Sequence, residues 1–293
     1  MFNKLLIIGC GLIGSSILRS SINKKISKSI YIYEKSRRNI KVIKKINKNI
    51  KFINKLGDDL SEMDFIIICS PMSQYEIIFN KINKTLSSHT VITEVGSTKR
   101  NLLKFTKKKN LVLSHPIAGS EVSGPIFGNK ELFKNKWCII IKKGEKNKIK
   151  IVKKFWKKLG SKVIFMNADE HDKIFSITSH LPHLIAYNLI KTAQDYQKKG
   201  KKNIIKYSAG GLRDFSRTAA SNETMWRDIF FGNKDNMIKT INLFVKNLNT
   251  IKKNIKNEDN FQLKKVLINA KKVRRQIISL KQDVSKPDFG RNI

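Results

Sequence analysis

The chain has 293 residues and carries 60 Lys or Arg against 22 Asp or Glu, which gives a formal net charge of +38. Its length suits two ordinary domains, and a hydrophobic fraction of 40% is compatible with a folded core. No apolar run reaches the ~18 residues that a membrane helix needs, so we expect no membrane span. The three cysteines are odd in number and lack CxxC spacing, which argues against a disulfide framework and favours the cytoplasm.

The positive charge raises nucleic acid as a partner, but its distribution argues against one. Basic residues are spread from Lys4 to Arg291 among abundant Asn and Ile, a combination that an AT-rich coding sequence favours. The sequence has no zinc spacing, no RNP-like aromatic stripe and no clear helix-turn-helix signature. We therefore expect no nucleic-acid partner and no membrane partner, and a basic nucleic-acid-binding module remains a distant alternative.

The chain begins with a dinucleotide-binding pattern. An apolar run at 4–8 is typical of a buried strand, and a G-x-G-x-x-G motif follows at once and leads into a helical segment. The glycines allow a tight turn, close approach of a pyrophosphate and close packing of helix on strand. The helix N-terminus adds N–H groups and a positive dipole end. The predicted cofactor-binding residues in this loop are Gly9, Gly11, Leu12, Ile13 and Gly14.

A second predicted strand, at 29–33, ends at Glu34, twenty residues past Gly14. A carboxylate at this position would hold the ribose hydroxyls of NAD and repel the 2′-phosphate of NADP. Arg37 and Arg38 follow closely and would favour a 2′-phosphate. We therefore expect NAD as the cofactor, with NADP left open.

Alternation of strands and helices continues through the first half of the chain. A helix is predicted at 148–159, and further strands are predicted at 65–69, 90–93, 111–114, 137–141 and 162–166. This order is typical of an α/β Rossmann-like, doubly wound parallel sheet. The loops after residues 69, 93 and 114 should open at one carboxyl-end edge, facing the nicotinamide. They contain Ser70, a further cofactor-binding candidate, Ser97 and His115.

Helical patterns replace strands from Ala168 onward. We therefore predict an NAD(P)-binding Rossmann-like domain over 1–167 and an all-α C-terminal domain over 168–293. On a straight helix Asp172 and His183 would lie about 20° apart, although Pro182 should disturb that helix.

Three polar motifs stand out. They are His115-Pro-Ile-Ala-Gly-Ser120-Glu121, Ser179-His180-Leu-Pro-His183, and Arg213-Asp214-x-x-Arg217 followed by Met225-Trp226. The histidine pair could hold a metal, but no third ligand stands at metal spacing, so we expect no metal site. A packed or capping pair is the other interpretation. Asp214 and Arg217 could equally form a surface ion pair.

Together with the glycine loop and Ser97, these motifs resemble signatures of the TyrA family, the prephenate and arogenate dehydrogenases, over about residues 4–240. Glu94, Ser216 and Glu223 depart from the family's usual Asp, Thr and Pro. The resemblance implies an NAD(P)-dependent oxidoreductase of tyrosine biosynthesis, which converts prephenate to 4-hydroxyphenylpyruvate with loss of CO₂ and hydride transfer to NAD⁺. Arogenate dehydrogenase or a dual-specificity cyclohexadienyl dehydrogenase is the alternative. A β-hydroxyacid dehydrogenase is more distant, because it would carry a catalytic Lys in the helical half.

The resemblance also implies roles for individual residues. His115 would accept the proton of the substrate hydroxyl, a task suited to a neutral imidazole, and Ser97 would orient that hydroxyl. Arg217 offers a planar fork for a substrate carboxylate. The remaining substrate-binding candidates are His183, Ser120, Glu121, Trp226 and Asp214, the last holding Arg217 in place, with Asp172 a weaker candidate.

The resemblance further implies a homodimer formed through the helical domain. We also expect a minimal form without a chorismate mutase or ACT domain.

Overall fold

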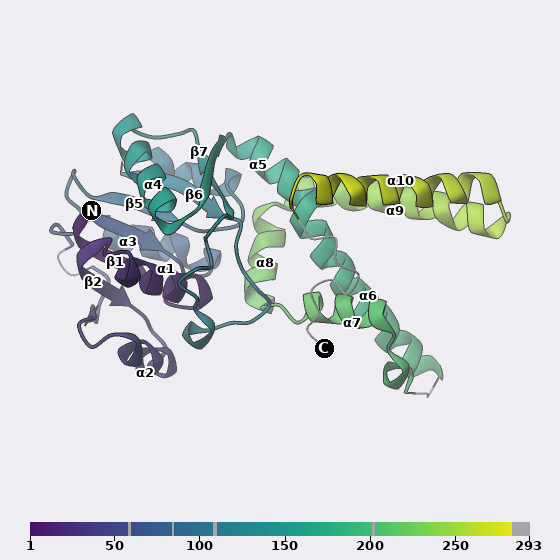
Figure 1. The fold of residues 1–293 in the computed structure, drawn as a ribbon, viewed down its shortest axis with the longest axis horizontal. Coiled ribbons are helices and arrows are strands. Elements are labelled where there is room, and N and C mark those ends of the chain that lie inside the picture. Colours follow the sequence, from purple (N-terminus) through teal and green to yellow (C-terminus); the bar gives the residue numbers. More distant parts are fainter. Residues whose placement is uncertain (58–59, 84, 108–109, 201–202, 283–293) are drawn as a thin grey trace. The chain divides into compact units, whose positions relative to one another are not determined.

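The computed structural model describes residues 1–57, 60–83, 85–107, 110–200 and 203–282 (Figure 1). Its packing defines two compact units, Met1–Met237 and Ile238–Ile293, which are described separately. The predicted division after residue 167 falls within the first unit and stays a prediction. Residues 283–293 of the predicted helical domain lie outside the described part of the chain.

An eight-stranded sheet with the strand order β3-β2-β1-β4-β5-β6-β7-β8 forms the centre of the first unit. The order changes direction between β1 and β4, the switch point at which open α/β sheets bind dinucleotides. The strands are β1 (Phe2–Ile8), β2 (Ser27–Tyr33), β3 (Lys51–Phe52), β4 (Phe65–Ile68), β5 (Val91–Glu94), β6 (Leu111–Pro116), β7 (Trp137–Ile141) and β8 (Lys162–Met166).

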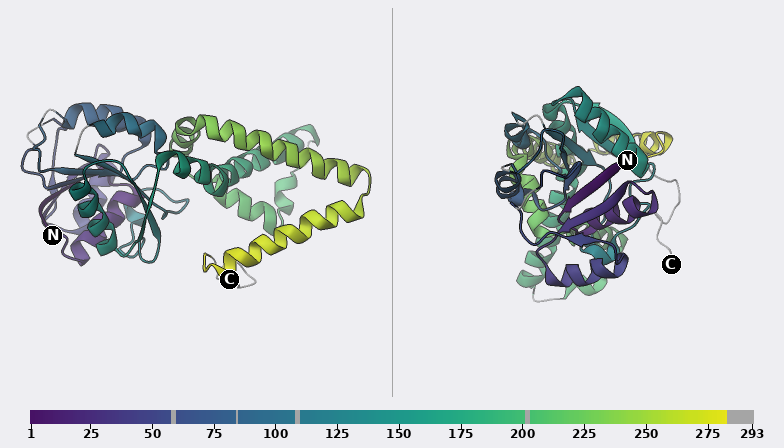
Figure 2. Two further views of the ribbon diagram at one scale, coloured as in Figure 1. Left: turned by 90° about the horizontal axis from the view of Figure 1, so that it is seen from above. Right: turned by 90° about the vertical axis from the view of Figure 1, so that its left-hand side faces the viewer.

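The central strands form because their apolar runs are buried on both faces of the sheet. All four residues of β4 are buried, as are Leu5–Ile8 of β1. Helices α1 (Leu12–Asn23), α2 (Arg37–Ile46) and α4 (Lys146–Leu159) contribute to the core on one face. Helix α3 (Tyr75–Ile82) and the 3₁₀ segment Arg100–Lys107 contribute to the core on the other (Figures 1 and 2). The predicted Rossmann-like fold class is thereby confirmed.

One strand runs against the predicted direction. β7 pairs antiparallel with β6, with His115 opposite Ile139, whereas the other neighbours in the sheet are parallel. The connection from β6 to β7 contains the short 3₁₀ turn Pro125–Phe127 and no crossover α-helix. Such a connection suffices for an antiparallel pair, whereas a parallel pair usually needs a helix. The sheet is therefore mostly, not wholly, parallel.

The first unit continues in helices after the sheet. Helix α5 (Ala168–Phe175) passes through a π-helical segment, Ser176–His180, into α6 (Leu181–Gly200). The straight-helix relation between Asp172 and His183 does not hold, because the π segment between them changes the angle gained per residue. The disturbance expected at Pro182 therefore lies just before it in the chain. The later helices are α7 (Gly210–Ala219), α8 (Glu223–Gly232) and the start of α9 (Lys234–Lys256).

The second unit contains most of α9 and helix α10 (Asn260–Ser279), joined by a turn at which Asp259 caps α10. Figure 2 shows the two helices diverging from that turn. Leu243 and Leu248 of α9, and Leu267 and Val273 of α10, are exposed. In the described part of the chain, no helix combines the length and hydropathy needed to cross a membrane.

Candidate active site

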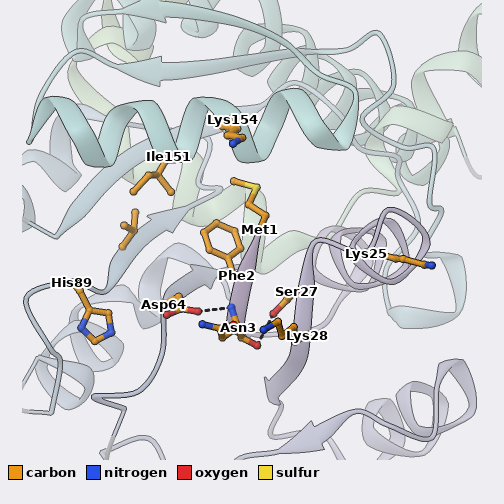
Figure 3. Close-up of a pocket in the computed structure, with 11 residues that line it drawn as sticks. Met1, Phe2, Asn3, Lys25, Ser27, Lys28, Asp64, His89, Ile151 and Lys154 are labelled. Carbon is orange, nitrogen blue, oxygen red and sulfur yellow. Dashed lines mark hydrogen bonds between the residues drawn. The ribbon is translucent and has the colours of Figure 1, made fainter.

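The two edges of the sheet differ sharply in what they carry. A surface pocket of ≈ 760 Å³ lies at the amino ends of the strands, where Asn3, Asp64 and His89 help to line it (Figure 3). None of the predicted site residues lines this pocket. The glycine loop and Ser97 follow the carboxyl ends of β1 and β5 instead. His115, expected in the loop after residue 114, lies within the last residues of β6, which extends to Pro116.

The glycine loop has the geometry of a phosphate-binding turn. Gly9 adopts a φ of +85°, and a Cβ there would lie 2.6 Å from Oγ of Ser70. A Cβ on Gly14 would collide with the carbonyl oxygen of Gly9. By contrast, a Cβ built on Gly11 would meet no described atom within 4 Å apart from its two neighbours in the chain, which leaves room for a pyrophosphate. Gly11 also brings no capping side chain to α1, so the N–H groups of its first turn are left for a phosphate.

Glu34 follows β2 and is oriented by backbone N–H groups. Its carboxylate accepts hydrogen bonds of 2.9 Å from the N–H of Cys10 and of 2.9 Å from the N–H of Ser36. Glu34 therefore connects the glycine loop to the start of α2. Arg37 and Arg38 are both exposed at that start. These residues fit a dinucleotide whose ribose lies beside Glu34.

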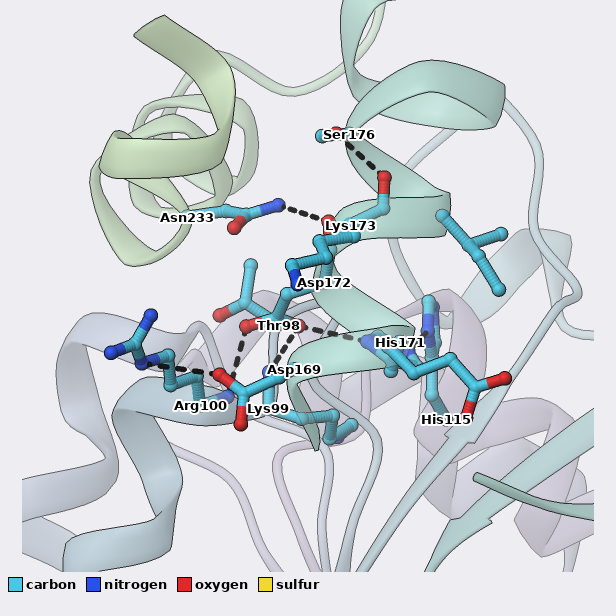
Figure 4. Close-up of polar contacts among 12 residues, drawn as sticks. Thr98, Lys99, Arg100, His115, Asp169, His171, Asp172, Lys173, Ser176 and Asn233 are labelled. Carbon is cyan, nitrogen blue, oxygen red and sulfur yellow. Dashed lines mark hydrogen bonds and ion pairs between the residues drawn. The ribbon is translucent and has the colours of Figure 1, made fainter. Parts of the chain in front are cut away.

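His115 is a buried residue near the carboxyl end of β6, and its ring lies against Phe175 of α5. Its Nδ1 lies 2.8 Å from Nε2 of His171, and Nδ1 of His171 lies 2.8 Å from Oδ1 of Asp172 (Figure 4). Burial lowers the pKa of His115 well below its ordinary value, and the neighbouring His171, Lys99 and His180 lower it further. A histidine in this setting stays neutral at pH 7 and can accept a proton.

Asp172 also binds the loop that contains Ser97. Its carboxylate accepts hydrogen bonds from the backbone N–H of Lys99 at 2.8 Å and of Arg100 at 2.9 Å. The side-chain amide of Asn233 donates to the backbone carbonyl of Asp172 at 2.7 Å. The half-buried Ser97 therefore precedes a turn that is fixed to α5.

A buried ion pair lies behind His115. Nζ of Lys99 is 2.5 Å from Oε1 of Glu94 and donates to the carbonyl of Ser114 at 2.7 Å; neither side chain of the pair is exposed. Glu94 also accepts the N–H groups of Gly96 and Ser114. Burial raises the pKa of Glu94 and lowers that of Lys99, and each partner opposes the shift of the other.

His183 and Trp226 bring α6 and α8 together. Their rings stack with centroids 3.8 Å apart, and Nδ1 of His183 donates to the carbonyl of Ser179 at 2.9 Å. Burial lowers the pKa of His183. His180 lies edge-on to Trp226 and is almost fully buried, and burial lowers its pKa to about 4.

Arg217 lies in a more open part of the unit, on α7. Its Nη1 is 3.2 Å from Oε1 of Glu121, in the loop after β6, and its side chain is 63% exposed. The pKa of Glu121 is lowered by its own backbone N–H and by Arg217. Ser120 is exposed and its hydroxyl lies 3.3 Å from Glu121. Asp214, expected to hold Arg217, lies one turn earlier on α7, and its predicted role stays a prediction.

The structure thus connects His115 to the Ser97 loop through His171 and Asp172, and joins Arg217 to Glu121. Sequence reasoning missed His171, Lys99 and Asn233. The signal for His171 was modest, a histidine directly before an acid in the first turns of a helix. Among the described residues, no group of three or more His, Cys, Asp or Glu is arranged to hold a metal ion.

The fold and the glycine loop define a dinucleotide-binding protein of the Rossmann type. Family models add detail: the prephenate dehydrogenase nucleotide-binding domain matches residues 19–165, and the prephenate dehydrogenase dimerization domain matches 167–269. The chain belongs to the prephenate dehydrogenase family, which confirms the predicted resemblance.

Individual relatives agree with this assignment. A cyclohexadienyl dehydrogenase of Zymomonas mobilis is 31% identical over 266 residues, which cover 88% of this chain and 90% of that protein. The structure of Aquifex aeolicus prephenate dehydrogenase in complex with hydroxyphenyl propionate and NAD⁺ matches with a TM-score of 0.87 and 32% identity, over 94% of this chain and 98% of that one. Synechocystis arogenate dehydrogenase, at 19% identity and a TM-score of 0.75, over 93% of this chain and 99% of that one, is similar in fold.

Proposed function

We propose that this protein catalyses the oxidative decarboxylation of prephenate to 4-hydroxyphenylpyruvate with NAD⁺ as the hydride acceptor. The observation that carries the proposal is the position of His115, a buried histidine with a lowered pKa at the carboxyl end of β6. Arogenate is the second candidate substrate, since a relative of this chain is named as a cyclohexadienyl dehydrogenase.

His115 accepts the hydroxyl proton of the substrate while the hydrogen on the same carbon leaves as hydride. The alcohol carbon thereby becomes a carbonyl. Loss of CO₂ then breaks the bond to the ring carboxylate, and its electron pair makes the ring aromatic. The phenol oxygen takes back the proton from His115, so the reaction releases no net proton. Aromatisation provides the driving force, and the protein contributes positioning and the transfer of one proton.

Several side chains hold the substrate in this proposal. Ser97 orients the hydroxyl, and Arg217 binds a carboxylate through its planar guanidinium. His183 and Trp226 form one wall of the pocket, and Ser120 and Glu121 complete the side near Arg217. Because Glu121 already pairs with Arg217, the incoming carboxylate competes with it for the guanidinium.

The cofactor fits the glycine loop. Gly11 leaves room for the pyrophosphate, Ser70 supports the turn at Gly9, and Glu34 accepts the ribose hydroxyls. NAD⁺, when bound, supplies the acceptor for the hydride. Glu34 favours NAD⁺ over NADP⁺, whereas Arg37 and Arg38 leave NADP⁺ as an alternative.

The assembly in this proposal is a homodimer formed through the helical part of the chain. The match to a dimerization domain and the exposed apolar side chains of α9 and α10 support it. The three cysteines, Cys10, Cys69 and Cys138, are all free, which supports a reducing compartment, the cytoplasm.

Initial rates of reduced-cofactor formation test the proposal directly. Prephenate and arogenate are each supplied with NAD⁺ and with NADP⁺, and turnover should be highest with prephenate and NAD⁺. Faster turnover of arogenate would make arogenate, not prephenate, the substrate. Faster turnover with NADP⁺ would make NADP⁺ the cofactor. Folded protein that turns over none of the four combinations would contradict the proposal.

A further inference from the structure

We infer that His171 is a positioning residue that fixes the proton of His115 on Nδ1 and leaves Nε2 as the base, with Asp172 fixing the proton of His171 in turn. The inference rests on the proposed function, in which His115 accepts the hydroxyl proton. The contacts that carry it are the hydrogen bonds among these three side chains (Figure 4).

The argument begins at Asp172, which is 1% exposed. An ionised carboxylate can only accept hydrogen bonds. Asp172 accepts the N–H of Lys99 and the N–H of Arg100, and both donors are backbone groups whose direction is fixed. The third contact, 2.8 Å from Nδ1 of His171, must therefore also be donated to Asp172. The proton of His171 consequently lies on Nδ1.

The next step follows from the charge of His171. Burial lowers its pKa, against the opposing effect of Asp172, so the ring is neutral at pH 7. A neutral imidazole with its proton on Nδ1 has a lone pair on Nε2. This Nε2 lies 2.8 Å from Nδ1 of His115 and must accept a hydrogen bond from it. His115 therefore carries its proton on Nδ1, and its Nε2 has a free lone pair.

This arrangement matters because an isolated neutral histidine prefers its proton on Nε2, which would block the base. The bond to His171 reverses that preference before substrate binds. It also assists when Nε2 of His115 takes up the hydroxyl proton, since the resulting imidazolium still donates from Nδ1 to His171. The proton returns to the phenol oxygen, and neither His171 nor Asp172 gains or loses one.

The carboxylate of Asp172 also links the two histidines to the loop that contains Ser97. Lys99 and Arg100 lie two and three residues after Ser97, so Asp172 fixes the turn next to the Ser97 hydroxyl as well as the tautomer of the base. Asp169 lies on the same helix but is exposed, and its carboxylate lies 3.4 Å from the side chain of Arg100. In the proposed reaction His115 and Ser97 contact the same substrate hydroxyl. The buried carboxylate of Asp172 thus orients both residues.

Nitrogen-15 spectra of histidine-labelled protein test the inference without depending on turnover. Long-range nitrogen–proton correlations distinguish protonated from unprotonated ring nitrogens, and the chain has five histidines. The signals of His115 are those lost in the variant His115→Asn. We expect wild-type His115 to carry its proton on Nδ1 at pH 7.5. A proton on Nε2 would overturn the inference even if the enzyme is active.

Two variants separate positioning from packing. His171→Leu removes the acceptor, so His115 should move its proton to Nε2 and kcat should fall at least about 10-fold, with the KM for prephenate changed less than about 3-fold. His171→Gln restores an oxygen near the position of Nε2 and should recover much of kcat along with the Nδ1 proton. A Gln variant as slow as the Leu variant would overturn the positioning role.

His89→Leu is the matched control, because His89 is exposed and lies at the opposite edge of the sheet. It should leave both kcat and the His115 spectrum unchanged. If prephenate and arogenate are not turned over by the wild-type protein, the proposed function fails while the spectra still decide the tautomer.

Discussion

His115 and Arg217 have the two main tasks of the proposed reaction, and the protein holds them in opposite ways. His115 is buried and connected through His171 to Asp172, whereas the side chain of Arg217 is 63% exposed and pairs with Glu121. Proton transfer demands a fixed geometry and a dry site, which a buried network provides. Capture of a charged substrate demands an accessible cation that can exchange one carboxylate for another.

The largest expected effect comes from removing the base. His115→Asn should lower kcat by ~10²–10⁴, the usual contribution of a general base, and should change KM little. Steady-state kinetics with prephenate and NAD⁺ measure both constants. His89→Asn, at the opposite edge of the sheet, is the control and should behave as wild type. Near-normal turnover of His115→Asn would remove His115 from the mechanism.

A substitution in the buried ion pair behind His115 should lower the free energy of unfolding more than a substitution at the surface. Glu94→Gln leaves Lys99 buried without its counter-charge, and removing one partner of a buried pair costs about 3–5 kcal/mol of unfolding free energy. Denaturant unfolding monitored by circular dichroism measures the loss.

The control for that experiment is an exposed pair on the same unit. Glu76→Gln breaks the ion pair with Lys104, in which both side chains are more than half exposed. We expect a loss of about 1 kcal/mol or less, because solvent screens such pairs. Equal losses of unfolding free energy in Glu94→Gln and Glu76→Gln would contradict the difference between the buried and the exposed ion pair.

Substitution of the exposed Arg217 should change KM for prephenate more than kcat. Arg217→Ala removes a charge-assisted contact of about 1.5–3 kcal/mol, so KM for prephenate should rise roughly 10-fold to 100-fold. Arg213→Ala, one turn earlier on the same helix and also exposed, is the matched control. A KM unchanged in Arg217→Ala would reduce its contact with Glu121 to a surface ion pair.

Sequence patterns predicted the strands well because most are continuous apolar runs. The bounds of β7 and β8 agree with the prediction, and those of β4 differ by one residue. The direction of β7 was missed, because composition does not encode which way a strand runs. The π segment Ser176–His180 was not predicted, although a disturbance of the helix at Pro182 was.

The histidine network was harder to foresee. His171 lies outside the three polar motifs, and its importance comes from contact with a residue 56 positions away. Asp172 was predicted as a weak candidate, yet its three hydrogen bonds give it a central position. Motifs located His115 and Arg217, but only packing distinguishes the residue that is fixed from the one that is free to exchange partners.

The pH dependence of kcat/KM for prephenate tests the central claim, that His115 is a neutral, buried base, most directly. Because its pKa is lowered by burial and by the neighbouring His171, Lys99 and His180, His115 should remain neutral as the pH falls through the ordinary histidine value of 6.5. The acid-side loss of activity should therefore begin below pH 6.5, and that limb should disappear in His115→Asn. An acid limb centred at or above 6.5, or one that persists in His115→Asn, would contradict the account.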